Sequence, residues 1–320
     1  MNNTYKTIWN AARQMYLVVS EAVGSQGGRG VLASSMMTAG LVYAGSHAAI
    51  ALADSTVYTP YEVSMNPSAW TQDRGGSPAL ALVEWEGRDA LKLSVNPPAT
   101  TDSFNNWQGY SQRTTVSAGA SFLRGDLWIN SDWQTGTSTD FVNTGMWGSA
   151  MPESVVAAGS YVNNEAAFPI IHFSNQDGAG HLRVWDEGEW VDLLQTASLI
   201  NYGSWNTLDL RLLPAENLIE YYFNGELVYS WNPPETASGT PSQFWAMYLK
   251  ARNNGVTVFD TYWSRLLAGQ VYVNGDIVGD TSGDVVVDAG AIAQVASGAT
   301  IAGTLLAEGR TTQQAGANFA

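Results

Sequence analysis

The chain contains no cysteine among its 320 residues and only three histidines. Disulfide bridges and cysteine-ligated metal sites are therefore excluded, so stability must come from a hydrophobic core, which a chain of this length can build. His172 and His181 are the histidines that follow residue 53, and their spacing does not match that of a zinc site. Neither a serine-hydrolase motif nor a phosphate-binding loop is present.

Positive charge is scarce as well. The chain carries 14 Lys and Arg against 29 Asp and Glu, which gives a net charge of −15. Lys6, Arg13 and Arg29 precede residue 53, where Glu21 is the only acidic residue, so the remainder of the chain is more acidic still. An acidic surface repels phosphate-bearing partners. We therefore expect neither nucleic acid nor anionic lipid as a partner.

Long uninterrupted apolar runs are also missing. The apolar segment 31–53 is broken by small and polar residues, namely Ser34, Ser35, Gly40, Gly45, Ser46 and His47. A stable membrane span, which needs about 20 apolar residues, is therefore not expected. The segment ends Ala51-Leu52-Ala53, and small residues at these positions fit the pattern that signal peptidase requires. We predict a secretion signal that is cleaved after Ala53.

The segment that precedes this signal has a specific pattern. Its matching residues are Met1-Asn2, Tyr5, Ile8-Trp9-Asn10 and Val18-Val19-Ser20-Glu21. In these residues the chain resembles the extended signal-peptide region of type V secretion in Gram-negative bacteria. The resemblance implies export to the cell surface or the medium, and we expect a helical signal over 1–53. It also implies an outer-membrane translocator barrel as a partner, for which residues 269–320 leave no room.

Residues 54–268 are rich in aromatic side chains, and all tryptophans except Trp9 lie within them. Apolar and polar residues alternate over 90–95, 205–212 and 218–223, as expected for strands with one face in a core. Asn224-Gly225 then predicts a tight type I′ turn. Long helical periodicity is hard to find after residue 53. Composition and spacing predict an all-β fold built as a two-sheet sandwich.

Three passages favour one kind of sandwich. A strand that begins Trp205-Asn206-Thr207 is followed by a strand that ends Phe223-Asn224-Gly225, and the passage 258–263 closes the segment. In these residues the chain resembles the concanavalin-like jelly roll of lectins, laminin-G-type modules and several glycan-active enzymes. The resemblance covers residues 55–268 and implies a jelly-roll domain over 54–268. It does not specify an activity, because this fold carries many.

Residues 269–320 have a different texture, without tryptophan and rich in Gly, Ala and Val. A V-x-x-G-A-x unit occurs at 287–292 and again at 295–300. Each unit predicts one short strand and a corner that glycine permits, and stacked units would bury Val and Ile in a column. The segment resembles the opening coils of an autotransporter β-helix. We therefore predict the start of a β-helix over 269–320.

Aromatic residues in polar surroundings are the candidate ligand contacts. Trp107 and Tyr110 lie in a loop-like polar stretch, and Trp133 and Trp147 lie in polar, glycine-rich sequence. Rings placed in this way can stack on sugars, although most tryptophans are expected to fill the core. Nearby oxygen-bearing side chains make a calcium ion a possible cofactor, with Asp102, Asn105 and Asn106 as its ligands. No other cofactor is expected.

A second set of residues points to chemistry instead of binding. The chain has Gln112-Arg113, then Ile171-His172, then Tyr248-Leu249-Lys250-Ala251, in that order. In this order it resembles several jelly-roll polysaccharide lyases, although the Gln that precedes His in those enzymes is replaced by Ile171. The resemblance implies that Arg113 would neutralise a uronate carboxylate, with Lys250 beside His172 and Tyr248. The latter two would act as base and acid in β-elimination.

Three functions remain open from the sequence. The first is a cell-surface or secreted head that binds a glycan and serves adhesion, with no committed catalytic residue. The second is a lyase that acts on an acidic glycan. The third is a structural cap that covers the open end of the β-helix.

Overall fold

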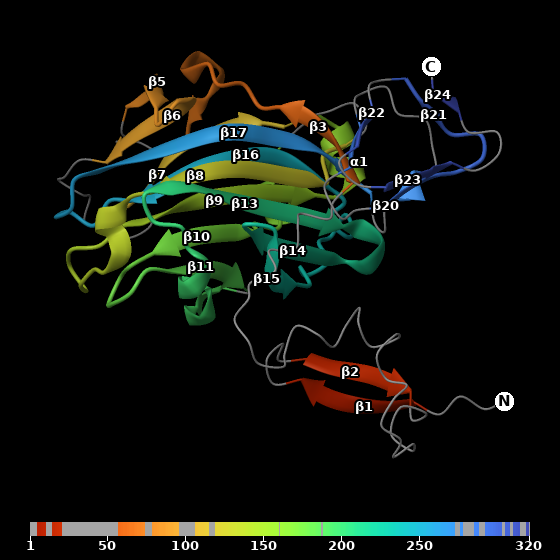
Figure 1. Ribbon diagram of the computed structural model, residues 1–320, viewed down its shortest axis with the longest axis horizontal. Helices are drawn as coiled ribbons and strands as arrows, with labels where there is room; N and C mark the ends of the chain where they lie inside the picture. Colours follow the sequence, from red (N-terminus) through yellow and green to blue (C-terminus); the bar gives the residue numbers. More distant parts are fainter. Residues whose placement is uncertain are drawn as a thin grey trace. The chain divides into compact units, whose positions relative to one another are not determined.

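The computed structural model describes most of the chain (Figure 1). The described residues are 5–10, 15–20, 57–73, 79–95, 106–114, 119–159, 161–186, 188–272, 276–277, 285–287, 292–302, 305–307, 310–313 and 318–319. The chain divides into two compact units, residues 1–50 and 51–320. Each unit is described by itself.

The first unit contains an antiparallel pair of strands, β1 (Tyr5–Asn10) and β2 (Met15–Ser20). The helix expected over this part of the signal is wrong for these residues. Their sequences, YKTIWN and MYLVVS, are rich in β-branched and aromatic side chains, which favour strands. The proposed cleavage site at Ala53 lies outside the described residues.

The second unit is built on two sheets, both antiparallel except for the last strand pair of the larger one. The seven-stranded sheet has the order β12-β11-β10-β9-β16-β7-β4. Its strands are β4 (Thr71–Gln72), β7 (Trp107–Arg113), β9 (Asn143–Met151), β10 (Ile170–Ser174), β11 (His181–Asp186), β12 (Glu189–Leu193) and β16 (Gln243–Arg252).

The ten-stranded sheet has the order β15-β14-β13-β8-β17-β3-β19-β22, and β6 joins it beside β17 and carries β5. Its strands are β3 (Val57–Glu62), β5 (Leu80–Trp85), β6 (Arg88–Val95), β8 (Phe122–Ile129), β13 (Ser204–Leu213), β14 (Leu218–Phe223), β15 (Glu226–Trp231), β17 (Phe259–Val271), β19 (Val285–Val287) and β22 (Leu305–Ala307). Figure 1 shows the long strands β8, β13 and β17 running side by side.

Among the described residues, helical structure consists of one short helix and a few short 3-10 segments. The helix is α1 (Glu153–Ala157), and the 3-10 segments are η2 (Pro67–Ala69), η3 (Ser131–Gln134), η4 (Asn163–Glu165), η5 (Leu194–Leu199) and η6 (Pro214–Glu216). Across the described residues, none of these helices has the length and apolar character that a membrane span requires.

The core lies between the two sheets, where alternate residues of each strand meet. Leu208, Leu210 and Leu212 of β13 belong to one buried cluster with Met247 and Leu249 of β16. Burying each such side chain contributes about 1.5–3 kcal/mol to folding. The alternation read from 205–212 and 218–223 corresponds to β13 and β14, which are paired in register. The predicted all-β sandwich is therefore confirmed.

Short parallel strands make up the last part of the chain. They are β18 (Asp276–Ile277), β20 (Ile292–Val295), β21 (Thr300–Ile301), β23 (Arg310–Gln313) and β24 (Asn318–Phe319). Asp276 pairs with Gln294 and Gln294 with Thr312, while Thr300 pairs with Asn318, so partners are 18 residues apart. The V-x-x-G-A-x unit is thus not the stacking period, because its two copies begin at Val287 and Val295, only 8 residues apart, whereas paired residues are 18 apart. β17 also continues to Val271, past the boundary predicted at 268.

Candidate functional site

One face of the seven-stranded sheet points away from the core, and we call it the outer face. Along β16, alternate residues from Met247 to Ala251 belong to the core cluster, so Tyr248 and Lys250 lie on the outer face. Lys250 nevertheless has no exposed area, and the same is true of His172 on β10. Polar and basic groups are therefore enclosed on this face, which is an expensive arrangement unless each is paired.

One row of residues crosses the sheet in register. From β7 to β12 the row reads Gly109, Lys250, Gly145, His172, Arg183 and Asp192. Directly opposed residues in antiparallel strands have Cβ positions about 4.5–5.5 Å apart. The pairing therefore places Lys250, His172 and Arg183 on one line across the outer face.

Glycine at two positions of the row makes room for the functional side chains. A Cβ added to Gly145 would lie 2.1 Å from the carbonyl oxygen of Ile171 and 2.2 Å from Cδ2 of His172. A Cβ added to Gly109 would lie 2.0 Å from the carbonyl oxygen of Leu249. The imidazole consequently lies against the backbone of β9, in space that any other residue at 145 would occupy.

Both nitrogens of His172 have partners within the protein. The indole Nε1 of Trp147 donates a hydrogen bond to Nε2 of His172. Nδ1 of His172 lies 2.7 Å from Oδ1 of Asn143, to which it donates. Burial lowers the pKa of His172 well below its ordinary value of 6.5, and the charges of Arg183 and Lys250 lower it further. His172 is therefore a neutral imidazole with its proton on Nδ1.

Three indole rings, those of Trp107, Trp147 and Trp190, lie around this histidine. The ring centroid of His172 lies 4.8 Å from that of Trp107 on β7 and 5.2 Å from that of Trp190 on β12. Trp107 and Trp190 are themselves 5.3 Å apart, so they contact each other above the imidazole. Trp185 packs edge-on against Trp190 at 5.3 Å. These rings exclude water from His172, which explains its depressed pKa.

Cationic groups lie beside these rings. The guanidinium of Arg183 is 4.7 Å from the Trp190 ring and that of Arg252 is 5.8 Å from the Trp107 ring. Nζ of Lys250 lies 5.4 Å from the Trp147 ring and is paired with Asp73. Arg183 is paired with Asp192 at 3.1 Å. Contacts of this kind contribute about 0.5–2 kcal/mol each, depending on their desolvation.

A cavity of about 500 Å³ opens at the β11 end of this face. Arg183, Asp192 and His181 line it from the sheet, and the exposed Leu194 lines it from η5. Burial lowers the pKa of Arg183, the paired Asp192 opposes that shift, and the nearby Arg252 adds to it. The guanidinium of Arg183 therefore brings a poorly solvated positive charge to the lining of the cavity.

Two of the four aromatic residues predicted to touch a ligand lie in this cluster. Trp107 and Trp147 are in strands β7 and β9, not in the loops expected from their polar neighbours. Tyr110 packs against the main core instead, and the ring of Trp133, in η3, is 7% exposed within that core. Polar sequence misleads here because the strands of the outer face carry polar residues on one side.

The four residues of the lyase alternative share the outer face. Arg113 pairs across strands with Ala246, and its guanidinium stacks on the Trp245 ring at 3.7 Å. The hydroxyl of Tyr248 lies 3.4 Å from that of Ser149. His172, as described above, has no lone pair available to accept a proton from a substrate.

The proposed calcium ligands are described only in part. Asp102 and Asn105 lie outside the described residues. The carbonyl oxygen of Asn106 accepts a hydrogen bond from the backbone of Asn253 at 2.8 Å. Within the part of the chain that the structure describes, no group of three or more His, Asp or Glu side chains is close enough to hold a metal ion.

Several residues of the cluster could not be predicted from the sequence as parts of one site. Arg252 and Asp73 are far in the sequence from each other and from Arg183 and Trp190, which share one hairpin. A period-two pattern shows which side of a strand a residue faces, but the pairing of β10 with β11 and of β16 with β7 is tertiary information. The hairpin over 181–193 was the one available signal, since it places Trp185 opposite Trp190.

The N-terminal segment and the sandwich differ in what they match among known proteins. Residues 1–48 match the family described as the extended signal peptide of the type V secretion system. No curated protein matches the chain.

Similar solved structures include three carbohydrate-active proteins. A beta-glucanase of Bacillus licheniformis shares 14% identity with a TM-score of 0.35, over 68% of this chain and 98% of that chain. An alginate lyase from a Chlorella virus shares 10% with a TM-score of 0.41, over 63% and 93%. A laminarinase from a Flavobacterium species shares 9% with a TM-score of 0.39, over 65% and 95%. At these scores and identities the likeness carries no inference about activity.

The match over residues 1–48 decides localisation. It covers the residues Met1 to Ala48 that precede the predicted cleavage site, and its pattern was already visible in Ile8-Trp9-Asn10. The chain is therefore exported through type V secretion in a Gram-negative bacterium, to the cell surface or the extracellular medium.

Proposed function

We propose that the exported chain is a recognition head that binds an acidic glycan through the outer face of the seven-stranded sheet. The observation that carries the proposal is the in-register row in which Lys250, His172 and Arg183 lie on one line. Cations beside indole rings supply the two kinds of contact that a charged sugar offers, an anionic group and an apolar ring face.

Electrostatics support an anionic ligand. In a chain with a net charge of −15, Arg183, Arg252 and Lys250 gather on one face. Because burial lowers the pKa of both Arg183 and Arg252, their charged forms are under-solvated. A carboxylate or sulfate near them would replace lost water with charge-assisted hydrogen bonds, each of which contributes about 1.5–3 kcal/mol.

A buried donor on the same face also supports binding. Nδ2 of Asn143 is enclosed and has no hydrogen-bond acceptor among the described residues. An enclosed donor without an acceptor costs about 1–3 kcal/mol. Asn143 is already fixed by its bond to His172, so a ligand oxygen that reached this amide would find it oriented.

Binding is favoured over elimination because of His172. A general base must present a free lone pair within hydrogen-bond reach of the proton that it removes. Trp147 occupies Nε2, and Nδ1 carries the proton that bonds to Asn143. In this arrangement the histidine positions the indole of Trp147 and the amide of Asn143, which is a structural role.

The test uses the full chain and a panel of polyuronates and sulfated glycans, with neutral glucans for comparison. We expect saturable binding of an acidic glycan that weakens as salt is raised, without the near-ultraviolet absorbance of an unsaturated product. Arg183→Gln and Arg252→Gln should each weaken binding about tenfold, which corresponds to about 1.4 kcal/mol.

Arg265→Gln is the matched control for these variants. Arg265 lies in the ten-stranded sheet and its side chain is 54% exposed, so the same change in charge is made away from the outer face. Equal losses in all three variants would show a nonspecific charge effect and overturn the proposal. A rise in absorbance would replace binding by elimination.

A second function is favoured by a separate observation. Strand β3 pairs with β17 through Leu267↔Glu62 and with β19 through Val286↔Tyr58. β3 therefore joins the sandwich to β19, which in turn pairs in parallel with β22. This continuity supports a structural role in which the sandwich caps the open end of a β-helix that begins after β17.

A further inference from the structure

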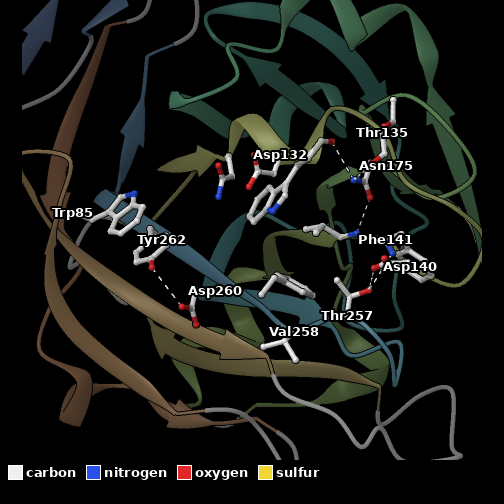
Figure 2. A pocket seen from close by; sticks show the side chains of 14 residues that line it. Trp85, Asp132, Thr135, Asp140, Phe141, Asn175, Thr257, Val258, Asp260 and Tyr262 are labelled. Carbon is white, nitrogen blue, oxygen red and sulfur yellow. Dashed lines mark hydrogen bonds between the residues drawn. The ribbon is translucent and has the colours of Figure 1, made fainter.

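A second cavity, of about 470 Å³, lies away from the outer face of the seven-stranded sheet (Figure 2). It is lined by Trp85 of β5, by Asp260 and Tyr262 of β17, by Asn175, and by some residues of the segments 130–142 and 257–259. It shares no residue with the row of Lys250, His172 and Arg183. Its volume is that of an ordinary small-molecule site, for which about 300–1,000 Å³ is typical.

The apolar wall of this cavity is an aromatic pair. The rings of Trp85 and Tyr262 are stacked, with centroids 3.9 Å apart and planes at 6°. Figure 2 shows the pair on one side of the cavity, with Phe141 across from it. Val258, also in the lining, is 67% exposed. Apolar side chains thus face open space at the rim, where they would cover a ring-shaped ligand.

The opposite wall is held in place before any ligand arrives. Oδ1 of Asn175 accepts a hydrogen bond from the backbone of Val142 at 2.7 Å, and its Nδ2 donates to the carbonyl of Trp133 at 3.1 Å. The hydroxyl of Thr257 donates to Oδ1 of Asp140 at 2.7 Å. A preformed wall removes part of the ordering cost of binding.

The charged side chains that line this cavity are all acidic. Asp132, Asp140 and Asp260 line it, and no Lys, Arg or His is among the residues that line it. Lys92 pairs with Asp260 from outside at 2.7 Å, which leaves Asp132 and Asp140 without a cationic partner among the described residues. The cavity therefore disfavours the anionic ligand that suits the outer face and favours a donor-rich or cationic one.

A metal ion does not fit this arrangement. Across the described residues no three His, Asp or Glu side chains converge closely enough to hold one ion. Carboxylates at separate positions around a cavity can instead each accept a hydrogen bond from a ligand that has donors at several positions. The separate carboxylates and the stacked aromatic rings together suit a ligand that is a polyhydroxylated ring with an amino group.

We propose that this cavity binds an amino-sugar unit with a free, protonated amino group. The ammonium would lie in the negative field of Asp132 and Asp140, hydroxyl groups would donate to Asp260 and to Thr135, and the apolar face of the ring would cover Val258 and the edge of the Trp85–Tyr262 pair. The site is independent of the acidic-glycan site, since the two differ in residues, charge and ligand.

The test is calorimetric titration of the full chain with glucosamine, glucose, N-acetylglucosamine and putrescine. We expect glucosamine to bind at least about fivefold more tightly than the two neutral sugars, and less tightly as salt is raised. Asp132→Asn and Asp140→Asn should each weaken glucosamine binding about two- to fivefold, as expected for partly exposed charge pairs. Glu216→Gln, an exposed change in η6, should leave it unaltered.

Each other outcome overturns the proposal. Equal binding of glucose would show that the carboxylates act only as hydrogen-bond acceptors. Equal binding of putrescine would show that the sugar ring contributes nothing to binding. Absence of glucosamine binding in a chain with an unchanged melting temperature would leave the cavity without this ligand. Arg183→Gln, which tests the outer face, should not alter glucosamine binding, so failure at one site is distinguishable from failure at the other.

Discussion

At the scale of single residues, His172 shows how burial decides a role. The same imidazole that resembles a catalytic base in sequence is covered by Trp107 and Trp190 and bonded at both nitrogens. A histidine at its ordinary pKa of 6.5 would be a proton-transfer group. Burial removes that capacity and leaves a neutral group that fixes its neighbours.

This burial predicts a pH dependence of stability. Because the pKa of His172 is lower in the folded protein than in the unfolded chain, the unfolded chain binds more protons below about pH 6.5. The contribution of His172 is complete above that pH and is lost as pH falls towards the folded pKa, by at most about 1.4 kcal/mol per pH unit. Denaturant unfolding at a series of pH values measures this slope.

His172→Gln is the comparison, since glutamine keeps a donor and an acceptor but does not titrate. The variant should lose less stability than the wild type between pH 6.5 and pH 4.5. Carboxylates titrate in both proteins, so their contribution cancels in the difference. Parallel stability curves for the two proteins would contradict the assignment of a neutral, enclosed imidazole.

At the scale of elements, strand β3 has two partners of different character. It pairs antiparallel with β17 of the sandwich and antiparallel with β19, whose other neighbour, β22, is parallel. A strand in this position covers an edge of the sandwich sheet at β17 and an edge of the C-terminal strands at β19. Unpaired edges invite other chains to pair with them, so covering them protects the fold.

The pairing predicts an effect of proline in β19. Val286→Pro removes a backbone donor beside Tyr58 and is expected to weaken the β3–β19 junction. Limited proteolysis should then cut residues 276–319 faster, while the near-ultraviolet circular dichroism of the tryptophan-rich sandwich stays unchanged. Ala237→Pro, in the exposed turn between Thr236 and Gly239, is the control substitution. Unchanged protection of the C-terminal strands would argue against the capping role.

At the scale of the whole molecule, export and fold are specified by separate segments. Residues 1–48 match the type V extended signal, and the sandwich lies within the second compact unit, residues 51–320. The absence of cysteine is consistent with a chain that crosses the outer membrane unfolded, since no disulfide can form on the way. Stability is then supplied by the core after export.

The signal predicts one processing event. Signal peptidase should cut after Ala53, so the exported protein should begin at Asp54. Mass spectrometry of the secreted protein measures the N-terminus. Ala53→Leu places a large residue at the cleavage position and should leave unprocessed chain in the cell, whereas Ala49→Leu should have no such effect. An N-terminus elsewhere would relocate the site.

The sequence by itself determined the export route, the all-β class and the β13–β14–β15 passage, because these depend on short-range signals. A signal peptide is read along the chain, alternation gives the buried face of a strand, and Asn224-Gly225 gives the turn, with positive φ at both residues. Each of these is decided within a few residues.

Only the tertiary structure decided which side chains meet. Trp107, Trp147, Trp190 and His172 come from four strands whose order and register no local pattern encodes. For the same reason the sequence placed Tyr110 and Trp133 with the ligand contacts, although both pack in or against the core. A one-residue difference in register would turn each side chain to the opposite face, so the candidate site exists only once the strands are paired.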